Sequence, residues 1–170
     1  MLAKQTVVAL AAALMLSASL AGVAAKIDLS RIALADDDKQ ATAQLFDWLQ
    51  SRGFDASMVN GVLVYRTKGT PLNLTALQGS GELDRIVVLS FYSPKDEARG
   101  KPGFYELAQK LNAVQNFMQV QVDEEGDLTI TASLTCVDEL SAREFDYFVD
   151  LYTQVLARYI LTDEAVKMLK

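Results

Sequence analysis

The chain has 170 residues, 51% of them apolar, and a formal net charge of −6. This length suits one domain with a sizeable core, and the acid excess disfavours binding to the phosphate backbone of nucleic acids. The sequence contains no histidine and one cysteine, which excludes an internal disulfide, a Ser-His-Asp or Cys-His nucleophile and a histidine-containing zinc site within this chain.

Residues 1–25 are predicted to be a secretory signal peptide. Lys4 is their only charge, residues 6–20 are mostly apolar, and Val23 and Ala25 fit the small-x-small pattern of a cleavage site after Ala25. Such a signal addresses a protein to the periplasm of a bacterium or to the exterior. The alternative is an uncleaved membrane tether, because residues 5–25 are uncharged and long enough to span the hydrocarbon layer.

An extended lead-in is predicted over residues 26–38, followed by a single domain over residues 39–170. The aspartates at 36–38 offer capping groups and negative charge at a helix start. The first helix is predicted over residues 39–52, with Gly53 as the residue that ends it. One face of this helix is apolar and carries Ala41, Leu45, Trp48 and Leu49.

Two short strands are predicted at residues 54–59 and 62–67. Asn60 and Gly61 lie between them, and these two residue types best tolerate the positive φ angles of a type I′ hairpin turn. The pair is the strongest local signal in the chain.

Residues 68–81 are predicted to be a loop because they contain Pro71 and a Gly-Ser-Gly run at 79–81. That run lacks the Lys-Ser/Thr ending of a phosphate-binding loop and is interpreted as a turn. Residues 83–92 are apolar and rich in β-branched and aromatic side chains, which predicts a central strand. An exposed loop is predicted at residues 93–103.

A second helix is predicted to begin near Phe104, followed by a hairpin with strands at 117–122 and 128–135. The acidic loop at 123–127 is the densest carboxylate cluster, but its spacing does not match a calcium-binding loop, which favours a solvated turn. Cys136 lies in a strand-like segment and is interpreted as a small buried residue, with a reactive thiol or an intermolecular disulfide as the alternatives.

The last long helix is predicted to start with a capping box formed by Ser141 and Glu144. A wide apolar stripe follows over about five turns, and a small sheet is not expected to cover all of it. Part of this stripe is therefore predicted to contact a second copy of the chain or another protein. The residues proposed for that face are Phe148, Tyr152, Val155 and Tyr159.

These elements predict an α/β (α+β) fold, in which an antiparallel sheet of about five strands packs with three main helices. A short final helix is expected after Thr162, ending at Lys170. The sequence indicates no catalytic set, no cofactor site and no metal site.

Residues 111–135, followed by a capped helix after Leu140, resemble the YbjN family. The shared features are a helix ending in a Leu-Asn pattern, a strand, an acidic Asp/Glu-Gly turn and a strand of alternating apolar residues. The first helix, which ends at Gly53 and Phe54, is similar as well. The resemblance implies a fold like that of type III secretion chaperones, which commonly dimerise, and a description as sensory-transduction regulators. It implies no catalytic residues. The predicted export signal is a departure from the family pattern, because a cytoplasmic regulator would not need one.

The function predicted from these features is a non-enzymatic, exported binding or adaptor module, chaperone-like in character, which acts on a peptide or protein partner and forms a homodimer in one version of the hypothesis. One alternative is an envelope structural protein tethered by its N-terminus. The other is an enzyme, since a Ser-Lys or cysteine-only mechanism needs no histidine.

Overall fold

The computed structural model describes residues 28–78, 83–160 and 162–170. The predicted signal peptide with Val23 and Ala25, and the Gly-Ser-Gly run at 79–81, lie outside the described residues. In chain order the elements are β1 (Arg31–Ile32), α2 (Asp38–Ser51), β2 (Asp55–Val59), β3 (Val62–Thr67), β4 (Thr70–Gln78), β5 (Leu83–Tyr92), α3 (Pro102–Val114), β6 (Gln119–Val122), β7 (Leu128–Val137), β8 (Leu140–Ser141), α4 (Ala142–Val155), the π-helix η1 (Leu156–Ile160) and α5 (Asp163–Met168).

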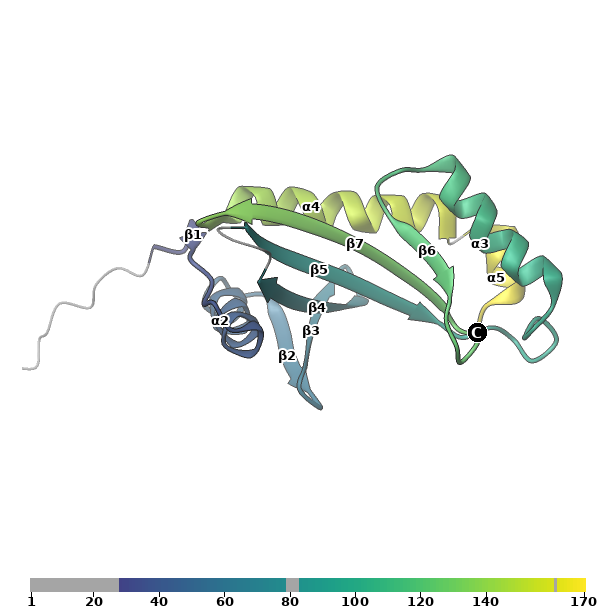
Figure 1. Cartoon of the computed structure of the whole chain (residues 1–170), viewed down its shortest axis with the longest axis horizontal. Coiled ribbons are helices and arrows are strands. Elements are labelled where there is room, and N and C mark those ends of the chain that lie inside the picture. The colour runs from purple at the N-terminus through teal and green to yellow at the C-terminus, as the bar shows by residue number, and fades with distance from the viewer. Residues whose placement is uncertain (1–27, 79–82, 161) are drawn as a thin grey trace, which may run out of the picture.

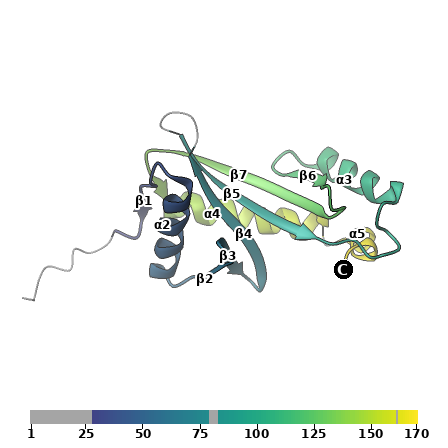
Figure 2. The same cartoon turned by 60° about the horizontal axis from the view of Figure 1, so that its bottom comes forward.

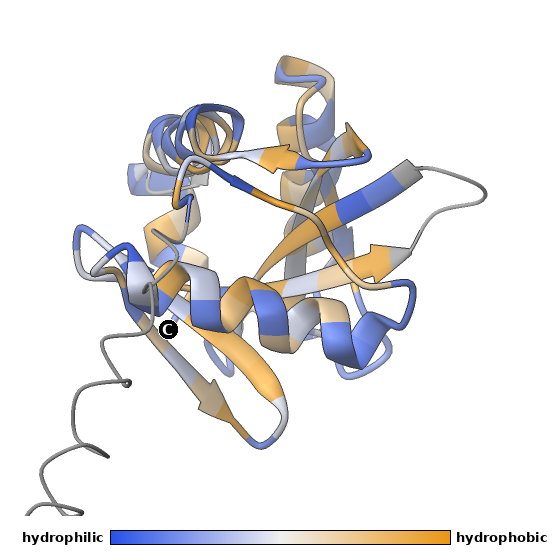
Figure 3. Ribbon diagram, turned by 90° about the vertical axis from the view of Figure 1, so that its left-hand side faces the viewer, coloured by the Kyte–Doolittle hydropathy of each residue, from blue (hydrophilic) through white to orange (hydrophobic). Residues whose placement is uncertain are grey.

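Six strands form one antiparallel sheet in the order β2-β3-β4-β5-β7-β6, and β1 pairs with β8 in a small second sheet. The long helix α4 runs along one face of the large sheet, α2 lies near the β2–β4 end, and α3 accompanies β6 (Figures 1 and 2). Figure 3 looks along α4 from the end at which α2 crosses the foreground. The predicted α+β architecture is confirmed.

The side chains that face the helices are buried and alternate along each strand, as expected for a sheet packed on one face. On the three central strands they are Leu72, Leu74, Ala76, Ile86, Val88, Ser90, Leu128, Ile130 and Ala132. The intervening side chains are more exposed, with the exception of the buried Thr129, and Phe91 retains 52% of its accessible surface. The core therefore lies between the sheet and its helix layer.

Two tight turns build the β2-β3-β4 meander. Asn60 and Gly61 have φ angles of 53° and 82°, which confirms the predicted hairpin turn. Lys68 and Gly69 repeat this geometry, with φ angles of 50° and 82°, and join β3 to β4. The prediction of a loop over residues 68–81 is therefore wrong for the part that forms β4, and the large sheet has six strands rather than five.

The sequence of β4 carries a strand signal that the prediction missed. Its apolar residues Leu72, Leu74 and Ala76 alternate with Asn73 and Thr75, the period of a half-buried strand. Pro71 had favoured a loop, but near the start of a strand a proline is tolerated where its missing N–H is not needed for pairing.

The start of α4 confirms its predicted cap. The Ser141 hydroxyl accepts a hydrogen bond from the Glu144 amide at 3.2 Å, and the Glu144 carboxylate accepts one from the Ser141 amide at 3.3 Å. This fixes the next residue, Phe145, whose ring meets Trp48 of α2 edge-on at 5.6 Å and Tyr65 of β3 at 6.0 Å. These contacts join α2, α4 and the sheet in one core.

The side chain of Thr42 on α2 completes the edge of β4 beyond the last residue paired with β3. Its hydroxyl accepts a hydrogen bond from the Ala76 amide at 3.2 Å and donates one to the Ala76 carbonyl at 3.4 Å. Both residues are buried, so the hydroxyl replaces the hydrogen bonds that a neighbouring strand would supply.

Replacing Thr42 with valine is expected to lower the free energy of unfolding by about 1–3 kcal/mol, because it leaves both backbone groups of Ala76 buried without a partner. Urea denaturation measures the loss. Thr153→Val is the control, since the Thr153 hydroxyl only back-bonds to helix carbonyls, and its effect should stay within about 0.5 kcal/mol. Equal losses in the two variants would contradict this role of Thr42.

Other helix side chains cover other sheet edges in the same way. Asn112 on α3 accepts a hydrogen bond from the Val120 amide at 2.8 Å and donates one to the Val120 carbonyl. Gln50 on α2 donates to the Ala56 carbonyl on β2. Such cover protects a sheet from pairing with other chains.

Within the described ranges, no helix has both the length and the apolar character needed to cross a membrane.

Candidate partner-binding groove

The four residues predicted to form a partner face on the last helix differ in exposure. Tyr152 has 0% and Phe148 5% of their accessible surface exposed. The Tyr152 hydroxyl donates to the Ile130 carbonyl at 3.1 Å and lies 3.0 Å from the Ser90 hydroxyl, and burial raises the pKa of Tyr152. Tyr152 therefore belongs to the core, where a partner cannot reach it.

Val155 lies half-buried beside the two most exposed apolar residues of α4. These are Tyr147, with 65% of its surface exposed, and Leu151, with 45%. They lie four residues apart on one side of the helix. Sequence reasoning missed both because they flank the predicted stripe rather than lie on it. Their spacing was visible, but the sequence does not show which side of α4 the sheet leaves uncovered.

An apolar groove runs along this side of α4, and we name it the α4 groove. Its first part has a volume of about 580 Å³ and its second about 570 Å³, and both include Phe117 and Leu151. Phe117, from the segment before β6, meets the ring of Phe148 edge-on at 5.9 Å. The lining residues used below are Phe117, Leu134, Tyr147, Leu151, Val155 and Tyr159.

Two arginines border the groove. Arg143 lies over the ring of Tyr147, 5.6 Å from its centre, and Arg158 lies over Tyr159 at 5.4 Å. Tyrosine and arginine are enriched among the residues that dominate protein–protein binding energies. The groove thus combines a large apolar surface with donors at its rim.

The last five residues of the helix that lines the groove form the π-helix η1. Wide turns of this kind occur frequently at functional sites. Arg158 and Tyr159 line the groove, whereas Leu156 and Ala157 line a second cavity on the other side.

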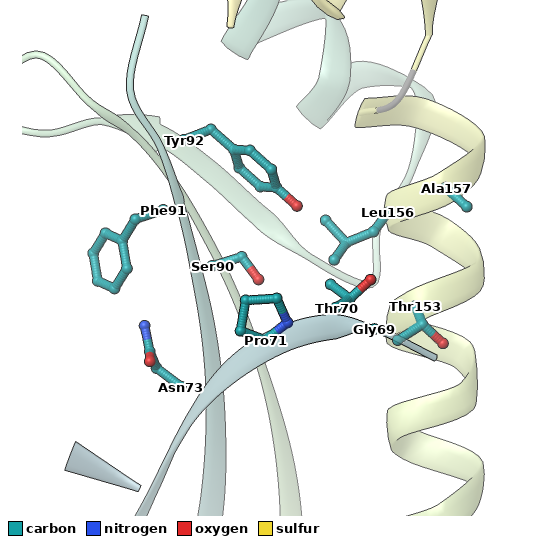
Figure 4. A pocket seen from close by; sticks show the side chains of 10 residues that line it. All are labelled: Gly69, Thr70, Pro71, Asn73, Ser90, Phe91, Tyr92, Thr153, Leu156 and Ala157. Carbon is teal, nitrogen blue, oxygen red and sulfur yellow. The ribbon is translucent and has the colours of Figure 1, made fainter. Parts of the chain in front are cut away.

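That second cavity is a cleft of about 390 Å³ between β4, β5 and the end of the long helix. The ladder between the two strands starts at the pair of Asn73 and Leu89. Beyond it the strands separate, and Tyr92 and Leu156 point toward one another across the space (Figure 4). Burial raises the pKa of Tyr92, so its hydroxyl stays protonated at neutral pH.

The separation of β4 and β5 has a local cause. Thr42 bonds the backbone of Ala76 from the side away from β5, and bonding alternates along an antiparallel ladder. If the ladder continued past Asn73 and Leu89, the next hydrogen-bonded pair would be Pro71 and Phe91. The backbone N–H of residue 71 would then have to donate to the Phe91 carbonyl, and proline has no N–H. Pairing of β4 with β5 thus ends just before the position where a proline would have to donate, and the volume of the cleft lies at the lower end of small-ligand pockets.

Acidic residues gather where β7 ends. Burial, followed by the charges of Asp36 and Asp138, raises the pKa of Asp84. The nearby Glu139 is paired with Arg31 at 3.3 Å. The charges of Asp36 and Asp138 thus reach Asp84, and Asp138 directly follows the last residue of β7.

The acidic loop at 123–127 is held by its own carboxylate. Asp123 accepts hydrogen bonds from the amides of Glu125 at 3.0 Å and Asp127 at 2.9 Å, and from the Thr129 hydroxyl at 3.1 Å. These bonds, chiefly the one from Asp127, lower the pKa of Asp123. Among the described residues, no three acidic, cysteine or histidine side chains lie close enough to hold a metal ion.

The lowered pKa of Asp123 predicts an acid-sensitive contribution to stability. A carboxylate of this kind stabilises the fold above the pKa of an unfolded aspartate, about 3.9, and this contribution is lost as the pH falls through the folded value. Asp123→Asn should therefore destabilise the protein at pH 7, and the difference from the original chain should shrink toward pH 3. Thermal unfolding across this range measures it, with the exposed Glu124→Gln as control. A pH-independent difference would contradict the prediction.

Cys136 is 7% exposed, which confirms its interpretation as a small buried residue. Burial, and then the charges of Asp84 and Glu144, raise the pKa of its thiol to about 11. The thiol is therefore protonated at neutral pH and a weak nucleophile.

The chain is similar to known proteins in its sequence and in its fold. The family model YbjN, described as "Putative bacterial sensory transduction regulator", matches residues 41–164. The chain is similar to a solved structure described as "Crystal structure of YbjN, a putative transcription regulator from E. coli", with a TM-score of 0.55, 14% sequence identity, and coverage of 75% of this chain and 94% of that chain. This likeness shows the fold. No curated protein matches the sequence.

Proposed function

Because the chain belongs to the YbjN family, whose description is that of a regulator, we propose that it is a non-enzymatic binding module and that its α4 groove holds an apolar segment of a protein partner. The observation that carries the proposal is the exposure of Tyr147 and Leu151 beside Phe117 in one continuous groove. Fully burying one such side chain contributes about 1.5–3 kcal/mol.

The ionisable groups with shifted pKa values support a binding role rather than catalysis. Asp123 closes a turn, Glu144 caps α4, and Tyr152 and Cys136 are buried in the core. Each shift follows from a hydrogen bond or burial with a structural purpose.

Selection from a library of random 12-residue peptides, displayed on phage and presented to the purified full chain, tests the proposal. Peptides rich in apolar residues should be recovered, and their binding should depend on the groove. Selected peptides that bind equally well to a groove variant, or a selection that recovers no specific binder, would overturn it.

We also propose that the protein is exported and works outside the cytoplasm. The support is the order of Lys4, an apolar stretch and small residues up to Ala25. Intact-mass measurement of the protein from its native host should show the loss of residues 1–25. Retention of these residues would instead favour the tethered envelope protein.

A further inference from the structure

We infer that the partner segment binds as an extended strand, which adds to the free edge of β7 at residues 133–137 and directs alternate side chains into the α4 groove. This inference rests on the proposed function and specifies the conformation and chemistry of the segment.

The direction of the backbone groups on β7 follows from Val120 on the neighbouring strand β6. Asn112 bonds both backbone groups of Val120 from outside the sheet, so Val120 does not bond with Ile130, its partner in the ladder. Bonding alternates along the ladder. The next pair, Gln119 and Thr131, is therefore hydrogen-bonded, and the N–H and C=O of Thr131 point toward β6.

The same alternation continues along β7 after β6 has ended at Gln119. The N–H and C=O groups of Ser133, Thr135 and Val137 point to the side that β6 would occupy, and no described strand lies there. Of these groups, the Val137 carbonyl accepts a hydrogen bond from the Glu139 amide at 2.7 Å. Figure 2 shows β6 beside only one half of β7. All three side chains are exposed, Val137 by 56%. Leu134 and Cys136 point their backbone groups the other way, toward β5.

This stretch contrasts with the other edges of the sheet. Thr42, Gln50 and Asn112 bond backbone groups on β4, β2 and β6 that no neighbouring strand pairs, whereas no hydrogen bond from a described helix reaches Ser133 or Thr135. An uncovered edge normally invites pairing with another chain. The free stretch spans five residues, or about 16 Å, which is the usual length of a strand.

The groove lies where the side chains of an added strand would point. Leu134 projects from the free half of β7 into the groove, opposite Tyr147 and Leu151 of α4. Because side chains alternate along a strand, every second residue of the segment would face these residues. Backbone pairing would supply affinity and the groove would select apolar side chains, as in other cases of strand addition.

The charge at the end of the edge specifies one more residue of the partner. Acidic charge lies at this end of the edge: the exposed Asp138 directly follows Val137, and Asp84 pairs with Cys136 on the β5 side of β7. A lysine or arginine at the end of the segment that lies beside Val137 would complement it. The partner is therefore an extended peptide segment with alternating apolar residues and one basic end.

The peptides from the selection test this inference when their amides are N-methylated one at a time. Methylation of every second amide should weaken binding at least tenfold, and methylation of the intervening amides should have little effect. On the protein, Thr135→Pro removes the Thr135 N–H, which points to the free edge, and leaves the N–H groups of Leu134 and Cys136, which bond to β5. This variant should also weaken binding at least tenfold. Thr135→Val keeps the donor and is the matched control, and thermal unfolding verifies that both variants fold.

Three outcomes would overturn the inference. Selected peptides with apolar residues spaced by three or four, bound through the groove and insensitive to Thr135→Pro, would indicate a helical segment and leave the proposed function intact. Peptide binding that does not change when alternate amides are N-methylated would show that the peptide backbone does not pair with β7, and would also leave the proposed function intact. A dimer of the protein alone that Thr135→Pro converts into a monomer would assign the edge to a second copy of the chain. If the groove variant and the edge variant both bind the peptides as well as the original chain does, the proposed function itself is overturned.

Discussion

Replacing Phe145 with alanine is expected to lower the free energy of unfolding by about 3–5 kcal/mol. The side chain is fully buried, and its ring contacts Trp48 and Tyr65 edge-on. The substitution removes both ring contacts and leaves a cavity at the junction of α2, α4 and the sheet. This loss is a large part of the 5–15 kcal/mol that stabilises a typical domain.

Equilibrium unfolding in urea measures this effect. Tyr147→Ala is the matched control, since it removes an aromatic side chain from the same helix where 65% of its surface is exposed. The control should change stability by less than about 1 kcal/mol. Similar losses for Phe145→Ala and Tyr147→Ala would mean that the rings do not have the burial described above.

Leu151→Glu is expected to weaken the binding of selected peptides by about 30-fold or more, equivalent to about 2 kcal/mol. Leu151 borders both parts of the α4 groove, so a carboxylate there would be desolvated by any apolar segment. Because the side chain is 45% exposed in the free protein, the variant should fold normally.

Fluorescence anisotropy with a labelled peptide measures the affinity of this variant. Val166→Glu is the matched control, because Val166 is 50% exposed on α5 and does not line the groove. It should bind like the original chain. If Leu151→Glu and Val166→Glu bind equally well, the groove is not the binding site.

Local signals in the sequence predicted most of the fold because each has a direct physical cause. Asn60 and Gly61 tolerate positive φ, and Ser141 with Glu144 satisfies the free amides at a helix start. The strand β4 was missed because Lys68-Gly69 is a weaker signal for the same turn and because Pro71 suggested a loop. Its alternation of apolar and polar residues was present in the sequence.

The candidate site was less predictable than the fold, because it depends on pairing between distant segments. The sequence indicated a stripe on α4 too wide for a small sheet, but Tyr152 on that stripe is buried and the exposed residues are Tyr147 and Leu151. Their exposure follows from the fact that β6 pairs with only part of β7. No local pattern encodes where that pairing stops.

Amide hydrogen exchange of the full chain, resolved by residue with and without a selected peptide, tests the central claim most directly. The amides of Ser133, Thr135 and Val137 should exchange quickly in the free protein and slowly in the complex. Those of Leu134 and Cys136, which bond to β5, should be slow in both states. Fast exchange at Thr135 in a saturated complex would contradict strand addition, and slow exchange there in the free protein would show that the edge is already covered.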